Sequence, residues 1–95
     1  MEREELEAIV REEVFSFADV HGLNANFYFL ENREQHIYAV GAITYERQNR
    51  GYLPILVRIE DDKVFIECDN NMTPLHLELY QRGVPENQVV LAYPA

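Results

Sequence analysis

Three histidines, His21, His36 and His76, are the first residues of this chain to consider for metal or acid–base chemistry. Glu34 lies two residues before His36, and in a strand that spacing puts both side chains on one face. Glu78 lies two residues after His76, but in a helix that spacing separates the side chains by about 200°. The sequence contains no HExxH or CxxC pattern. We therefore expect no metal and no cofactor, and a small ligand-binding or enzymatic site around Glu34 and His36 stays an alternative.

The sequence offers little for nucleophilic or nucleotide chemistry. Ser16 is the only serine, and it lies in an acidic segment without a positioned base. Asp61 and Asp62 are adjacent, but we expect them at a hairpin tip where both carboxylates are solvated, whereas an acid–base pair needs one buried carboxyl group. The four glycines are scattered, so no glycine-rich phosphate-binding loop follows a strand. These features give no support for an enzyme that uses a nucleophile or a nucleotide.

One group of basic residues, Arg47, Arg50 and Arg58, is interleaved with tyrosines around an expected strand–turn–strand unit. Such a cluster could contact an anion or a nucleic acid. Alternatively, the arginines pair with Glu46 and Glu60 across the hairpin. The formal net charge of −9 favours the second interpretation, because affinity for a phosphate backbone comes from Lys and Arg.

Acidic residues are concentrated at the start of the chain. Residues 1–20 contain seven acids and two bases, a net charge of −5. This composition is typical of a solvated helix face. It is also what a surface that meets a basic protein partner would need, and Glu5, Glu12 and Glu13 are the residues that we expect to contact such a partner.

Length and composition predict one domain that spans residues 1–95. Cys68 is the only cysteine, so no internal disulfide can form, and we expect a reduced, cytoplasmic protein. No apolar run approaches the roughly 18 residues that span a bilayer, so we expect no membrane contact.

Hydrophobic spacing predicts the elements that position these residues. We expect a helix at 2–21 that ends near Gly22, because apolar residues recur there at intervals of three and four. Alternation predicts strands at 26–31, 35–45, 52–60, 64–68 and 89–93. Between the last two, Thr73 is the expected cap of a short helix that ends at Gly83. Gly41 and Pro54 indicate a bulge, a close approach or a sheet edge.

The resulting order, α-β-β-β-β-α-β, predicts an α+β fold in which a four-stranded antiparallel sheet and a C-terminal strand carry both helices on one face. The other face would then expose aromatic side chains such as Tyr28, Tyr38 or Phe65. An exposed face with several aromatics indicates an interface, including one between copies of this chain.

Several motifs of the last two thirds of the chain fit one known family. They are Arg33-Glu34, the run 62–67 (Asp-Lys-Val-Phe-Ile-Glu), Asp69, Glu78-Leu79 and the run 83–91 (Gly-Val-Pro-Glu-Asn-Gln-Val-Val-Leu). In these motifs the chain resembles the XisI-type fdxN element excision controlling factors of cyanobacteria. It departs from them at Phe65, where the family usually has Trp, and near Leu56, where the family has His.

The resemblance implies a non-enzymatic accessory protein for programmed excision of a DNA element, which is a form of DNA rearrangement by site-specific recombination. It also implies a protein partner of the XisH type, which looks nuclease-like, and it assigns no catalytic residues. An acidic surface could occupy the basic DNA-binding face of such a partner. Direct DNA contact through Arg47, Arg50 and Arg58 stays the alternative.

Overall fold

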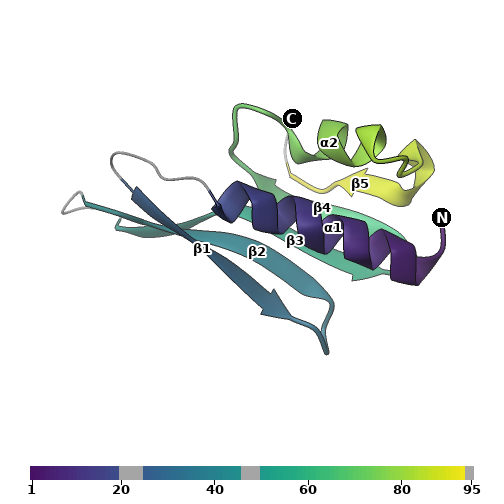
Figure 1. The fold of residues 1–95 in the computed structure, drawn as a ribbon, viewed down its shortest axis with the longest axis horizontal. Helices are drawn as coiled ribbons and strands as arrows, with labels where there is room; N and C mark the ends of the chain where they lie inside the picture. The colour runs from purple at the N-terminus through teal and green to yellow at the C-terminus, as the bar shows by residue number, and fades with distance from the viewer. Residues whose placement is uncertain (20–24, 46–49, 94–95) are drawn as a thin grey trace.

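The chain forms a curved sheet with two helices, as the ribbon of the computed structural model shows (Figure 1). The structure describes residues 1–19, 25–45 and 50–93. Its elements are α1 (Arg3–Ala18), β1 (Ala25–Asn32), β2 (Ile37–Thr44), β3 (Gly51–Glu60), β4 (Lys63–Asp69), α2 (Leu75–Gln81), the short 3₁₀ helix η1 (Glu86–Gln88) and β5 (Val89–Leu91).

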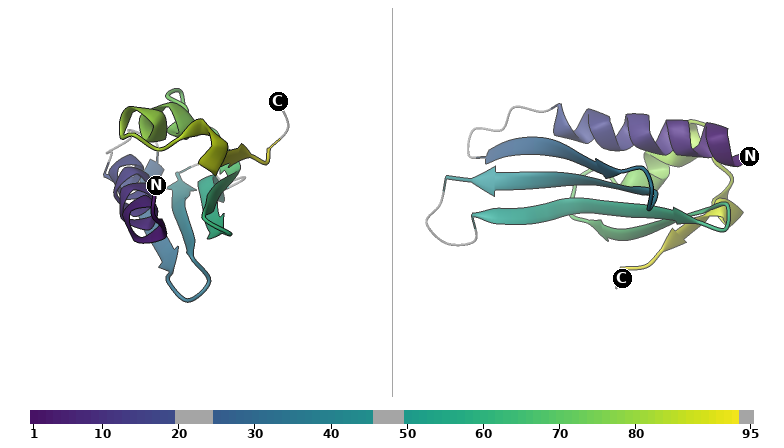
Figure 2. Two further views of the ribbon diagram at one scale, coloured as in Figure 1. Left: turned by 90° about the vertical axis from the view of Figure 1, so that its right-hand side faces the viewer. Right: turned by 90° about the horizontal axis from the view of Figure 1, so that it is seen from below.

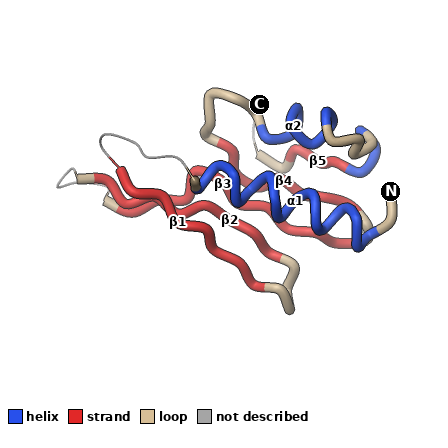
Figure 3. The backbone as a smooth tube through the Cα atoms, viewed as in Figure 1, coloured by secondary structure: helices blue, strands red, loops and turns tan. Residues whose placement is uncertain are grey.

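The strands form one sheet in the order β1-β2-β3-β4-β5 (Figure 3). The first four strands are antiparallel to their neighbours, whereas β5 runs parallel to β4. A parallel neighbour requires a crossover connection, and the segment with α2 provides it. The predicted α+β class and element order are confirmed, and the C-terminal strand extends the same sheet.

Both helices cover one side of the sheet, as predicted (Figure 2). The buried stripe of α1 faces alternate residues of the strands, because successive strand side chains point to opposite faces. The core residues of α1 are Leu6, Ile9, Val10 and Val14, those of the strands are Tyr38, Val40, Ile55, Val57, Ile59, Val64 and Ile66, and those of the C-terminal segment are Leu75, Leu79 and Val84.

Two tight turns follow the expected residue chemistry. Asp61 and Asp62 have φ values of 52° and 60°, so the β3–β4 hairpin uses the left-handed conformation that Asp tolerates. Gly83 has a φ of 90° after α2, and the Val84 N–H donates to the Leu79 carbonyl at 3.0 Å. This is the glycine stop that the sequence predicts.

Irregular pairing between β2 and β3 explains why the strands can contain Gly41 and Pro54. The register shifts between Val40 and Ala42, which leaves an extra residue on β3 in the stretch that contains Pro54. A bulge tolerates proline because one residue there does not donate to the ladder. A Cβ on Gly41 would lie 3.2 Å from Leu30 Cδ1, so the glycine also permits a close approach.

Three local predictions need correction. The α1 helix ends at Ala18, before residue 21, and the expected stop at Gly22 lies outside the described residues. Thr73 does not cap α2: Pro74 occupies the N-cap position, and Asp69 provides the capping side chain, because its Oδ2 accepts the Leu75 N–H at 2.7 Å. Tyr38 is 2% exposed and belongs to the core, because its strand turns the even positions of β2 toward α1.

Candidate functional site

The outer side of α1 presents an acidic surface, which we define by its exposed glutamates Glu4, Glu5 and Glu12. These residues lie on the side of α1 that faces away from the sheet, because the buried stripe occupies the inner side. The first turn carries Glu4 and Glu5, and the last turn of α1 contains no basic residue. The structure therefore leaves Glu5 and Glu12, two of the three expected contact residues, accessible to another molecule.

Glu13, the third expected contact residue, has an internal role. Its Oε1 accepts a hydrogen bond from Arg82 at 2.8 Å, and its side chain is only 16% exposed. Glu12 accepts from the same guanidinium at 2.7 Å. The two hydrogen bonds raise the pKa of Arg82 above its ordinary value. Arg82 directly follows α2, so this cluster joins the two helices and partly neutralises the C-terminal half of the acidic surface.

A second cluster connects α1 to the sheet, and no spacing in the sequence predicts it. Glu7 Oε1 accepts the Tyr38 hydroxyl at 2.6 Å and lies 2.7 Å from His36 Nδ1. Burial raises the pKa of Glu7, but the hydrogen bonds from Tyr38 and His36 outweigh it, so the net shift is downward. Burial and the same contact with Glu7 raise the pKa of Tyr38. His36 thus reaches a carboxylate of α1.

Arg58 is already paired within the sheet. Its Nε donates to Glu67 at 2.8 Å, its Nη1 donates to Glu60, and its guanidinium lies 4.1 Å from the centre of the Phe65 ring. The hydrogen bonds that Arg58 donates to Glu67 and Glu60 raise the pKa of Arg58. An incoming phosphate would therefore compete with two carboxylates for this cation.

Arg50, a second arginine of the expected anion cluster, does not join Arg58. Arg50 directly precedes β3, and Arg58 lies near the opposite end of that strand. Eight residues of extended chain span roughly 26 Å. Arg47 lies outside the described residues. The structure thus separates Arg50 from Arg58 and gives no common site for both.

The remaining candidates for chemistry do not converge in the described part of the chain. No group of three or more His, Cys, Asp or Glu side chains there could hold a metal ion. His76 stacks edge-on against Tyr80 at 5.6 Å, and its Nδ1 is buried without a hydrogen bond. Cys68 is half-buried, and its Sγ lies 3.1 Å from the Leu53 carbonyl oxygen. Glu34 and His36 lie in the turn before β2, not in a strand as expected, and they border an open hollow rather than an enclosed site.

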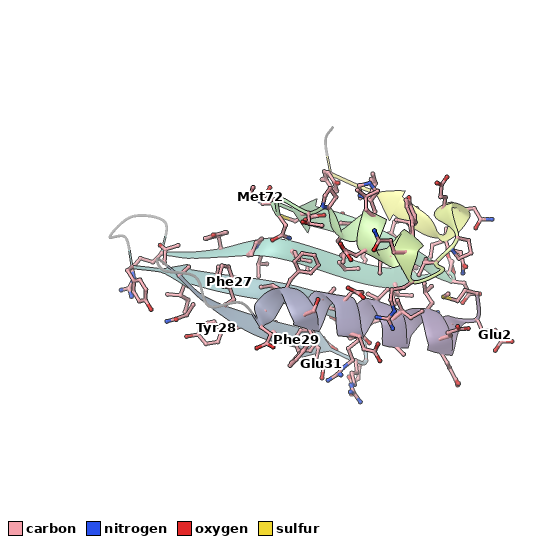
Figure 4. The ribbon with its side chains drawn as sticks, turned by 45° about the horizontal axis from the view of Figure 1, so that its top comes forward. Glu2, Phe27, Tyr28, Phe29, Glu31 and Met72 are labelled. Atoms are coloured by element: carbon pink, nitrogen blue, oxygen red, sulfur yellow. The ribbon has the colours of Figure 1, made fainter. Side chains whose placement is uncertain are left out.

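Contacts between α1 and the edge strand β1 involve the inward-facing residues of that strand. Phe29 stacks against Phe15 with ring centres 5.3 Å apart, and Glu31 pairs with Arg11 at 2.7 Å. Figure 4 shows Phe29 and Glu31 beside this helix. Tyr28, one position away from Phe29, points to the opposite face of the sheet. The two faces of the sheet therefore differ: one carries an acidic helix, and the other is open.

These features define a class of protein: a small α+β domain in which two helices cover one sheet face and an acidic surface lies outside. The chain matches the XisI protein family over residues 2–95, and it belongs to that family. The predicted resemblance is confirmed. None of the curated proteins matches this chain in sequence.

Two solved structures from Anabaena variabilis ATCC 29413 share the fold. A XisI-like protein is 21% identical, with a TM-score of 0.86 over 99% of this chain and 89% of its own. The fdxN element excision controlling factor XisI is 15% identical, with a TM-score of 0.78 over 94% of this chain and 84% of its own. Among the described residues, no helix is long and apolar enough to cross a membrane.

Proposed function

We propose that this protein is a non-enzymatic controlling factor for programmed excision of a DNA element, and that it acts by binding a protein partner of the XisH type. Membership of the XisI family supports the process, because a structural relative is described as an excision controlling factor. The acidic surface of α1 is the observation that supports the mode of action. Glu4, Glu5 and Glu12 would meet a basic face of the partner and so exclude DNA from it.

Direct contact with DNA is less well supported. The chain carries a formal net charge of −9, so its long-range field repels a phosphate backbone. Arg58, the best-placed cation of the sheet, already pairs with Glu60 and Glu67. Binding to a protein partner that itself binds DNA is compatible both with the net negative charge and with the pairing of Arg58.

Co-purification with an XisH-type protein from the same source tests the proposal. The complex should form at 0.1 M salt and dissociate at 1 M, because the screening length falls from about 10 Å to about 3 Å. Each exposed interfacial charge contributes about 0.2–1 kcal/mol, so Glu5→Gln with Glu12→Gln should weaken binding about 2- to 30-fold.

Glu34→Gln with Glu86→Gln is the matched control, because it removes the same charge from exposed positions that are not part of α1. Its affinity should fall much less. Binding that is insensitive to salt, or equal losses in the two double variants, would contradict a specific role for α1.

A further inference from the structure

The open sheet face, opposite the helices, carries large apolar side chains that no element of the described chain covers. Tyr28 and Leu30 from β1, Ile43 from β2 and Leu53 from β3 are each between 42% and 47% exposed. They line a shallow hollow of about 500 Å³ above Gly41. The bulge near Pro54 contributes to this surface, because it changes the alternation of β3 between Leu53 and Ile55. Monomeric proteins seldom expose a contiguous patch of this kind without using it.

Charges on the open sheet face cancel. Strand register places four charged side chains there, all at the β3–β4 end: two basic, Arg58 and Lys63, and two acidic, Glu60 and Glu67. Arg58 already pairs with both acids. Among the described residues, this face therefore presents no uncompensated charge next to its apolar patch. The acidic surface of α1 lies on the other side of the sheet.

We propose that the open sheet face is a homodimer interface, in which two copies of this chain pack sheet against sheet about a two-fold axis. Two copies that each carry a net charge of −9 repel one another, and this neutral face is where that repulsion is weakest. The arrangement turns both acidic helices outward, away from each other. A basic partner would find no electrostatic attraction on this neutral face, because the acidic surface that attracts it lies on α1. Aromatic side chains of a second copy are suited to fill the hollow.

The size of the face meets the lower limit for a pair of two copies. Four strands spaced about 4.8 Å apart are roughly 19 Å wide, and eight residues of strand are roughly 26 Å long. Each copy would thus cover roughly 500 Å² in projection, or about 1,000 Å² for the pair, which is the minimum expected of a biological interface. Packed sheets lie about 10 Å apart, so side chains of the present length can interdigitate.

Sedimentation equilibrium of the full chain tests this proposal without any partner protein, so its outcome is independent of the proposed function. Wild-type protein should sediment as a dimer, and association should strengthen from 0.1 to 1 M salt, because salt screens the repulsion while apolar contacts persist. Leu30→Glu, which places a charge in the hollow, should raise the dissociation constant at least about 100-fold.

Leu77→Glu is the matched control, because Leu77 on α2 is 46% exposed and Leu30 is 47% exposed. It should leave the dimer intact. Circular dichroism verifies that each variant is folded. If the Leu30→Glu variant has no cooperative unfolding transition, Tyr28→Glu is tested in its place. A wild-type monomer at every concentration and salt, or equal dissociation constants in the Leu30 and Leu77 variants, would overturn the proposal.

Discussion

Asp69 is expected to start α2, and its replacement by Ala should destabilise the protein by about 2 kcal/mol. Its Oδ2 accepts the Leu75 N–H at 2.7 Å, and its Oδ1 accepts the Asn71 side-chain Nδ2 at 2.9 Å. Leu75 is fully buried, so removal of the carboxylate leaves its N–H without a partner. Loss of a helix cap costs about 0.5–2 kcal/mol, and loss of a hydrogen bond to a charged group costs about 1.5–3 kcal/mol.

The effect is large enough to measure by thermal unfolding. In a domain of this size, 1 kcal/mol shifts the melting temperature by about 4–8 °C, so Asp69→Ala should lower it by about 8–16 °C. Asp69→Asn should cost less, because the amide oxygen can still accept a hydrogen bond. Circular dichroism at 222 nm follows the transition, and urea unfolding gives the free energy independently.

Thr73→Ala is the decisive control. Thr73 is exposed and precedes Pro74, the N-cap residue of α2, so its replacement should change the free energy of unfolding by less than about 0.5 kcal/mol. If Thr73→Ala cost as much as Asp69→Ala, the assignment of the cap to Asp69 would be wrong.

Two further substitutions test the helix stop and the cluster between α1 and the sheet. Gly83→Ala should lower the free energy of unfolding by about 1–2 kcal/mol, because Gly83 has a φ of 90°. Gly51→Ala is the control and should leave this free energy unchanged, because nothing lies within 4 Å of the Cβ position and the φ of Gly51 is not positive. Urea unfolding compares the two variants. The lowered pKa of Glu7 predicts stability that is present above its ordinary pKa of 4.5 and is lost as the pH falls through the folded-state pKa. Glu7→Gln should therefore lose less stability than wild type between pH 6 and acid pH; identical pH profiles of the melting temperature would contradict this.

Local features of the fold could be predicted from the sequence because each depends on a few neighbouring residues. The Asp61-Asp62 turn, the stop at Gly83 and the apolar stripe of α1 all follow from conformational preference or helical period. The cap of α2 was predicted wrongly for the same reason. Thr73 is the nearest residue of the right type, but the chain path returns Asp69, six residues before Leu75, to the helix start.

Features that join distant segments could not be predicted from spacing. Glu7 meets His36 and Tyr38 across separations of 29 and 31 residues, and Arg82 meets Glu13 across 69. The sequence showed that Glu13 is acidic but not that it is engaged internally. Tyr38 was expected on the open face, but the carboxylate of Glu7 accepts a hydrogen bond from its hydroxyl and allows its burial.

The two proposed surfaces should respond to salt in opposite directions, and this difference separates them in one experiment. Contact through the acidic surface of α1 depends on attraction between unlike charges, which screening weakens. Contact through the open sheet face depends on apolar burial against repulsion between two chains of net charge −9, which screening relieves. In a mixture with an XisH-type protein, rising salt should therefore release the partner while the chain remains paired with its own copy. Loss of both contacts as salt rises would contradict an apolar homodimer interface.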